Sequence, residues 1–257
     1  MHRKPGFALL LFTLLLFLSC GDEPHTLEWQ EKEYSGDSCS NCPSVNIRIP
    51  MGPEDNRLAR QVKTSLEEEI IYWLDYAESN KATTIREAIA SFTAGHAELQ
   101  EKFPDETAPW EADIQGEVSY SSPLLLCISL EGYLFTGGAH GYSSLRYLNF
   151  DAENARELES AELFADIAGF TSLAEMAFRK QYEVPADQDI NSTGFMFEDN
   201  RFSLPESIGF GEAGVLLHYD PYEVASYADG PLSLTIPYRE AAPFLNPEYS
   251  PVNTTSP

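Results

Sequence analysis

A histidine in a glycine-rich turn is the residue with the clearest chemical potential in this sequence. His140 lies within Thr136–Gly141, between two strand-like stretches. A loop histidine of this kind could bind a ligand or, with a nearby carboxylate, act as the general base of a hydrolase. A structural reading is simpler, because Gly137 and Gly138 permit positive φ angles and His140 can hydrogen-bond locally. We favour the structural reading and keep the hydrolase as an alternative.

The residue patterns of familiar catalytic sites do not occur in the sequence. It contains no Gly-x-Ser-x-Gly elbow and no His-Glu-x-x-His pair. The histidines His25, His96 and His218 show no metal-ligand spacing. The glycine turn is not a phosphate loop, because no Lys-Ser or Lys-Thr follows it. We therefore expect no catalytic residue, no cofactor and no metal.

Tyrosines and prolines crowd a second segment, close to the C-terminus. Tyr219, Tyr222 and Tyr227 occur there with Pro221 and Pro231. A loop tyrosine offers a large rigid face and a polar tip, which suits recognition, although the same residues could cap the core beneath a rigid turn. The candidate binding residues of the two segments are Gly137, Gly138, His140, Tyr219, Pro221, Tyr222 and Tyr227.

Three of the four cysteines, Cys39, Cys42 and Cys127, are expected to have structural roles. Cys39 and Cys42 most simply form a local disulfide in an oxidising compartment. A redox dithiol is the alternative, but Pro43 and a strand pattern follow the pair instead of the helix start that activates such thiols. Cys127 lies in an apolar run and is expected to be buried. Without a second pair, a zinc site of four thiolates is excluded.

The first residues predict export. Arg3 and Lys4 precede an apolar stretch at 7–18 that is shorter than the roughly 20 residues of a membrane span, which indicates a signal peptide. Ser19-Cys20 resembles the lipobox of bacterial lipoproteins, with Phe17 where Leu is common. The resemblance implies a lipid on Cys20 and an exported, membrane-anchored protein, most simply at the outer membrane. The alternative is an ordinary signal whose Cys20 pairs with another thiol.

The charge of the chain excludes one class of partner. The formal net charge is −25, and loss of Arg3 and Lys4 with the leader takes it to −27. Such a chain repels nucleic-acid phosphates, so we expect no nucleic-acid partner. The same charge steers cationic partners toward the surface, although it also serves solubility alone.

Hydrophobic periodicity predicts an α+β fold. We expect antiparallel sheets with a helical hairpin and one further helix, in two sub-domains that share a core and meet near Asp151. The expected helices cover residues 54–77, 84–103 and 164–178. The expected strands cover residues 45–50, 110–120, 124–135, 145–150, 202–204, 215–219 and 232–236, with a polar turn at 151–160.

The same patterns divide the chain into five parts. They are a signal peptide (1–19), a polar tether (20–43), an N-terminal sub-domain (44–150), a C-terminal sub-domain (151–245) and a polar tail (246–257).

Three segments carry a resemblance to a known family. They are Tyr133–Gly141, Leu163–Phe164 and Tyr219–Pro231, the last of which continues to Tyr238. Together they resemble the extracytoplasmic domain shared by the RsiV anti-sigma factor, a lysozyme receptor, and the N-terminal region of the peptidoglycan deacetylase PdaC. The order and spacing match over roughly residues 44–245. This chain has Ser226 where the family commonly has proline, which puts contacts that depend on the proline in doubt.

The resemblance implies a binding or sensing module. The chain shows neither the sigma-binding segment and membrane helix of the anti-sigma members nor the catalytic domain of the deacetylase. The implied protein is a non-enzymatic envelope lipoprotein that binds a protein or cell-wall ligand, and its sharpest version binds a cationic lysozyme-like muramidase. The alternatives are a hydrolase that uses His140 and a purely structural envelope component.

Overall fold

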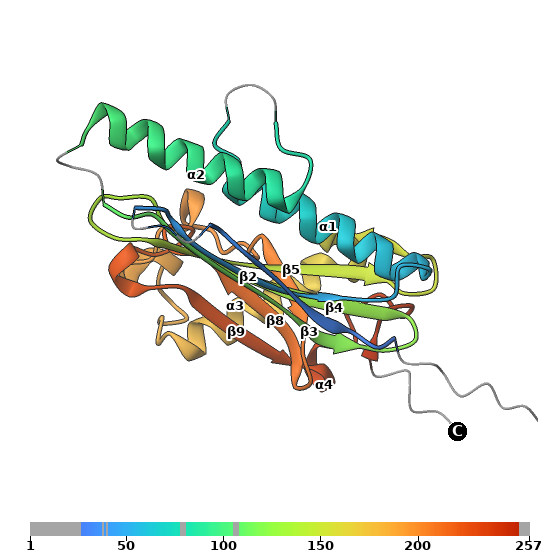
Figure 1. The fold of residues 1–257 in the computed structure, drawn as a ribbon. Helices are drawn as coiled ribbons and strands as arrows, with labels where there is room; N and C mark the ends of the chain where they lie inside the picture. The colour runs from blue at the N-terminus through green and yellow to red at the C-terminus, as the bar shows by residue number, and fades with distance from the viewer. Residues whose placement is uncertain (1–26, 38, 40, 78–80, 105–107, 252–257) are drawn as a thin grey trace, which may run out of the picture.

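The computed structural model describes residues 27–37, 39, 41–77, 81–104 and 108–251. Figure 1 shows the described chain as layers, with two helices on one face of a large sheet and a smaller sheet with a third helix on the other. The expected α+β class is confirmed. The segment expected to be a signal peptide lies outside the described residues, as do Cys20 and His25. Within the described ranges no helix is long and apolar enough to cross a membrane.

Six strands form the large sheet, which is mixed. In spatial order they are β1 (Gln30–Ser35), β2 (Ser44–Met51), β3 (Glu111–Ser121), β4 (Leu125–Phe135), β5 (Tyr142–Asp151) and β6 (Arg156–Leu158). The smaller antiparallel sheet contains β7 (Ser207–Phe210), β8 (Gly214–Tyr219) and β9 (Leu232–Pro237). The helices are α1 (Arg57–Leu74), α2 (Ile85–Lys102), α3 (Ile167–Gln181) and the short α4 (Tyr238–Ala241).

The expected helical hairpin forms, and side-chain caps set where its helices begin. Asn56 accepts a hydrogen bond from the amide of Ala59 at 3.0 Å, so α1 begins at Arg57 and not at residue 54. Thr84 caps α2 by accepting from the amide of Glu87 at 3.2 Å, as the capping-box pattern predicted. Asp75 ends α1 and accepts from the hydroxyl of Ser91 on α2 at 2.7 Å, which ties the two helices together.

The pairing of β2 with β3 is parallel, which the sequence analysis did not predict. Strands β3, β4 and β5 are antiparallel neighbours as expected. Parallel neighbours need a long crossover connection, and the helical hairpin between β2 and β3 supplies it across one face of the sheet.

The tether predicted for residues 20–43 is wrong over Gln30–Ser35. These residues form β1, which pairs antiparallel with β2. Their charged side chains belong to an exposed edge strand, where charge discourages pairing with other chains. Farther along the connection to β2, Cys39 and Cys42 form a disulfide with their Cα atoms 5.2 Å apart.

Three expectations for the second half are also wrong. The polar turn expected at 151–160 contains β6, which extends the large sheet past the boundary expected near Asp151. Residues 202–204 form no strand, and the partner of β8 is β7 instead. The tail is packed as far as residue 251, because Tyr249 is buried and its hydroxyl donates to Asp151 Oδ2 at 3.1 Å.

Two hydrophobic clusters lie on the two faces of the large sheet. Alternation along β4 divides its side chains between them, with Leu126, Ile128 and Leu130 facing the helical hairpin and Leu125 and Cys127 facing the small sheet. Cys127 is buried as expected, and burial raises the pKa of its thiol to about 11. The large sheet is therefore common to both halves of the chain.

Candidate functional site

The glycine turn and the tyrosine loop meet in space. The turn joins β4 to β5 at one end of the large sheet, and the loop joins β8 to β9. The ring of Tyr227 stacks on the ring of His140, with centroids 3.7 Å apart and an angle of 19° between the planes. The Tyr227 hydroxyl donates to the carbonyl oxygen of Gly141 at 3.0 Å, across 86 residues of chain. Two segments selected separately from the sequence therefore form one surface.

Two glycines of the turn adopt backbone angles that favour glycine over other residues. Gly137 and Gly138 have φ angles of 95° and 88°, which side chains rarely tolerate. Nδ1 of His140 lies 3.1 Å from the carbonyl oxygen of Gly141 and donates to it in the tautomer protonated at that nitrogen. Among the described residues, no carboxylate lies within ion-pair distance of His140. This geometry fits local hydrogen bonding better than general-base catalysis.

Aromatic rings gather around this junction and leave much of their area exposed. Tyr222 is 56% exposed and Tyr142 is 40% exposed. Tyr222 has a φ of 71°, an unusual left-handed value for a bulky residue, and its ring lies 5.7 Å from that of Tyr227. We call this group the aromatic surface, and its members are Tyr133, His140, Tyr142, Tyr222 and Tyr227.

Two other candidate residues support the surface from below. Tyr219 is buried, and its hydroxyl donates to the carbonyl oxygen of Ser203 at 2.7 Å. Pro221 is buried, and its carbonyl oxygen accepts from the hydroxyl of Tyr142 at 3.4 Å. Both residues lie too deep to contact a ligand in this conformation.

The loop is fastened by a buried carboxylate that the sequence analysis did not single out. Asp220 is 7% exposed and accepts four hydrogen bonds, from Ser144 Oγ (2.5 Å), Leu145 N (3.0 Å), Arg146 Nη1 (2.8 Å) and His218 Nε2 (3.2 Å). The amide of Leu145 lies on the free edge of β5, so Asp220 supplies a partner that a neighbouring strand would otherwise provide. Arg146 also reaches Glu69 on α1, with Nε 3.4 Å from Oε1. The Asp220 network therefore links the loop, the large sheet and the helical layer.

Ionisation of Asp220 is favoured despite its burial. Burial alone would raise the pKa of this carboxyl group, but the hydrogen bonds from His218, Ser144, Leu145 and Arg146 outweigh it and lower the pKa to about 2.

The lowered pKa predicts a loss of stability in acid. A carboxyl group whose pKa is depressed in the folded state contributes stability above its unfolded pKa, near 3.8, and that contribution disappears as the pH falls toward 2. We expect Asp220 to account for about 2 kcal/mol of the fall in unfolding free energy between pH 4 and pH 2. Urea unfolding at several pH values measures this fall. In the Asp220→Asn variant the unfolding free energy should fall by about 2 kcal/mol less between pH 4 and pH 2. If the variant and the parent lose the same amount, Asp220 is not the group responsible.

With His218 and Ser233, the Asp220 network has the Asp–His–Ser order of a catalytic triad. Nδ1 of His218 lies 3.0 Å from Ser233 Oγ, on the side of the ring opposite Asp220. Acyl transfer at Ser233 would also need donors for an oxyanion. The amide of Ser233 already donates to the hydroxyl of Tyr182 at 3.0 Å. We interpret the arrangement as a structural hydrogen-bond chain.

The remaining histidine and the possible metal ligands have structural placements. His96 is buried on α2 and packs against Trp110, with ring centroids 5.7 Å apart. In the described part of the chain, no three His, Cys, Asp or Glu side chains are arranged to hold a metal ion.

Three carboxylates and one guanidinium act on the Tyr142 hydroxyl of the aromatic surface. Glu223 accepts from the amides of Asp220 (2.9 Å) and Glu206 (3.1 Å), which holds it beneath the loop. Burial, followed by the charge of Asp220, raises the pKa of the Tyr142 hydroxyl. Glu223 and Glu206 raise it further, whereas Arg146 opposes them. A cationic group would therefore be attracted to this surface.

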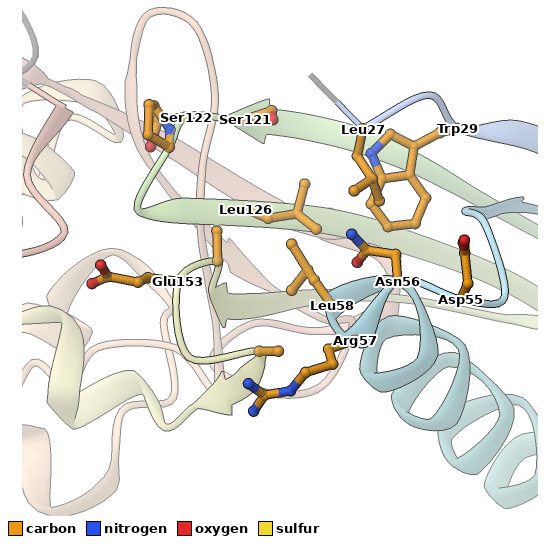
Figure 2. Close-up of a pocket in the computed structure, with 13 residues that line it drawn as sticks. Leu27, Trp29, Asp55, Asn56, Arg57, Leu58, Ser121, Ser122, Leu126 and Glu153 are labelled. Atoms are coloured by element: carbon orange, nitrogen blue, oxygen red, sulfur yellow. The ribbon is translucent and has the colours of Figure 1, made fainter. Parts of the chain in front are cut away.

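A cavity of about 600 Å³ lies at the other end of the large sheet, beside the β3–β4 turn (Figure 2). Its position could not be predicted from the sequence, because its walls come from four segments that are far apart in the chain. They are residues 27–29, the start of α1, the β3–β4 turn and the β5–β6 turn.

Comparison with known proteins matches both halves of the chain to families. Residues 37–143 match the family described as Deacetylase PdaC, and residues 161–239 match the protein family of unknown function DUF3298. No curated protein is significantly similar to the chain.

Two crystal structures of DUF3298 family proteins share the fold. The one from Pseudomonas aeruginosa PAO1 is 23% identical, with a TM-score of 0.61, and the match covers 88% of this chain and 97% of that one. The one from Bacteroides fragilis NCTC 9343 is 18% identical, with a TM-score of 0.67, and the match covers 88% of this chain and 95% of that one. The resemblance to PdaC noted in the sequence is confirmed, and the chain contains a region that matches the PdaC family model followed by a region that matches the DUF3298 model.

Proposed function

We propose that this protein is an exported, lipid-anchored binding module of the cell envelope, and that its ligand contacts the aromatic surface. The observation that carries the proposal is the stacking of His140 on Tyr227, which joins two distant segments and leaves Tyr222 exposed beside them. Exposed tyrosines on a rigid support are efficient recognition residues, because little conformational entropy is lost on binding.

The proposed anchor would orient this surface away from the membrane. Leu27 and Trp29 line the cavity, so the chain enters the fold at that end. Cys20 lies seven residues before Leu27, a span of at most about 25 Å. The aromatic surface lies at the far end of β4, which is 11 residues and roughly 35 Å long. A lipid on Cys20 would hold the cavity end near the bilayer and present the aromatic surface to the surrounding compartment.

We infer that the ligand is a cationic protein, and that a lysozyme-like muramidase is the sharpest test case. Support comes from the carboxylates around Tyr142 and from the net charge of −25. Support also comes from the resemblance to a family with a lysozyme receptor among its members. Neither alternative has comparable support, because a hydrolase would need a carboxylate partner for His140 and a structural role would not need exposed tyrosines.

Replacing Tyr222 with asparagine should weaken binding of a lysozyme by at least tenfold. Central aromatic residues of an interface commonly contribute 2 kcal/mol or more, and 1.4 kcal/mol corresponds to tenfold in affinity. Asparagine is chosen because it tolerates the left-handed backbone at this position. Isothermal titration calorimetry of the mature protein with a c-type lysozyme measures the change.

Met176→Ala is the matched control, because Met176 is a comparably exposed apolar residue on α3. This variant should bind like the parent, and binding by the parent should weaken as salt rises. Absence of heat with the parent at moderate ionic strength would reject the lysozyme interpretation. Equal affinities of the parent and Tyr222→Asn for lysozyme would instead show that the ligand binds another surface of the protein.

A further inference from the structure

The cavity beside the β3–β4 turn has an apolar floor and a polar rim. In Figure 2, Leu126 and Leu58 lie in the middle of it, with Leu27 and Trp29 on one side and Glu153 on the other. Its volume of about 600 Å³ falls in the range of small-molecule sites. Leu126 is 2% exposed, and the mostly apolar lining suits a hydrocarbon chain.

The course of the chain identifies a candidate occupant. A side chain at Gly52 would meet Leu27 and Trp29 at 3.0 and 3.2 Å, so these two residues pack closely against the segment that leads into α1. Leu27, the first described residue, therefore lies on the wall of the cavity. Cys20, seven residues upstream, can reach every part of the cavity, because that length spans up to about 25 Å.

The rim favours an uncharged lipid over a free fatty acid. Asp55 and Glu153 place two carboxylates on the cavity wall against the single guanidinium of Arg57. This excess of negative charge repels the carboxylate of a free fatty acid. The hydroxyl group of Ser121 and the guanidinium of Arg57 can donate to ester carbonyl oxygens, whereas the hydroxyl of Ser122 already donates to the carbonyl oxygen of Leu125 at 3.2 Å. Arg57 is held at the rim by donating to the carbonyl oxygen of Asn154 at 3.3 Å.

We propose that this cavity receives one ester-linked acyl chain of the lipid carried by Cys20. The proposal rests on the lipid anchor proposed above and is independent of the aromatic surface. Inside a bilayer the chain is already buried in hydrocarbon. The cavity therefore shelters it when the protein is outside a membrane, where an exposed acyl chain would drive aggregation.

Photo-crosslinking within the lipoprotein tests the proposal. Cells that express the full chain are fed a diazirine fatty acid, which enters the lipid on Cys20, and the protein is purified in a mild detergent and illuminated. Cross-linked peptides that contain Cys20 are mapped by mass spectrometry. We expect them to join the acylated N-terminus to the cavity segments 56–58, 121–126 and 152–155.

Filling the cavity should remove these cross-links. Ala152→Phe places a ring inside it and should lower their yield at least fivefold, and Ser121→Phe repeats the test from another wall if the first variant folds poorly. Ala94→Phe, at an exposed position in a separate groove of α2, should leave the yield unchanged.

The outcomes separate this proposal from the proposed function. An intact mass without acyl groups would overturn the anchor, and with it the cavity proposal. An acylated protein whose cross-links fall only on detergent, or persist in both filled variants, would overturn the cavity proposal alone. Lysozyme binding by Tyr222→Asn remains a separate measurement.

Discussion

Replacing Asp220 with alanine should lower the free energy of unfolding by about 3–5 kcal/mol, the usual result of removing one member of a buried ion pair. The carboxylate is 7% exposed and accepts from four donors, two of which belong to Arg146 and His218. Its removal leaves the amide of Leu145 and the hydroxyl of Ser144 without their partner. Small domains are stable by only 5–15 kcal/mol, so urea denaturation followed by circular dichroism will show a large shift in the midpoint.

An acidic residue outside the network provides the comparison for Asp220. Glu212 is exposed in the turn between β7 and β8, and Glu212→Ala should change stability by no more than about 0.5 kcal/mol. If the two alanine variants unfold at the same urea concentration, the Asp220 network does not hold the loop to the sheet. Asp220→Asn should lie between them, because an amide keeps the shape of the carboxyl group but loses its charge.

Sequence patterns predicted the elements whose hydrophobic periodicity is strong. Both long helices carry apolar residues at helical spacing, and Thr84 with Glu87 marks the start of α2. The apolar run that predicted β4 is a direct consequence of a sheet with a hydrophobic cluster on each face, because successive side chains on both sides of the strand are buried. In these segments the local pattern and the tertiary environment agree, so the sequence alone was sufficient.

Elements without such a pattern were missed for identifiable reasons. Five of the six residues of β1 are exposed, so nothing in its composition distinguishes it from a polar tether. All four residues of β7 are buried, which removes the alternation that marks a strand. Phe202 and Leu204 do alternate with polar residues, but they pack against the cluster from an irregular segment. Alternation shows which side chains are buried, and it does not show which backbone is paired.

The candidate site was also predicted only in part from the sequence. The turn at His140 and the loop at Tyr227 were selected from residue types and from family resemblance, whereas their stacking depends on tertiary structure. Asp220 had no distinguishing signal among the 41 acidic residues of the chain. Asp220 matters because it accepts a hydrogen bond from the Leu145 amide, on a part of β5 that no strand pairs with on that side. This contact joins residues 75 positions apart in the chain, so no local pattern in the sequence predicts it.

Support for the aromatic surface continues into the core beneath it. Tyr219 directly precedes Asp220, and its ring packs against those of Phe178 and Phe197 with centroids 5.9 Å away in both cases. The position of the loop therefore depends on an aromatic cluster between α3 and the small sheet. Phe178 is the centre of that cluster and contacts five rings, those of Tyr182, Phe195, Phe197, Phe202 and Tyr219.

Replacing Phe178 with alanine should lower the free energy of unfolding by about 3–5 kcal/mol, because it removes a fully buried ring and leaves a cavity. Near-ultraviolet circular dichroism should lose intensity in the folded state, since the remaining aromatic side chains gain freedom. Urea denaturation gives the change in stability. Because the cluster supports Tyr219, lysozyme binding should also weaken under conditions in which the variant is still folded.

Met176→Ala is the control for this change as well, since Met176 lies two residues away on the same helix and is 64% exposed. It should alter stability by no more than about 0.5 kcal/mol. If Phe178→Ala is destabilised but binds lysozyme with the affinity of the parent, the aromatic surface does not depend on the cluster. The Asp220 network would then be sufficient to hold the loop, because its contacts reach the large sheet and α1 without passing through α3.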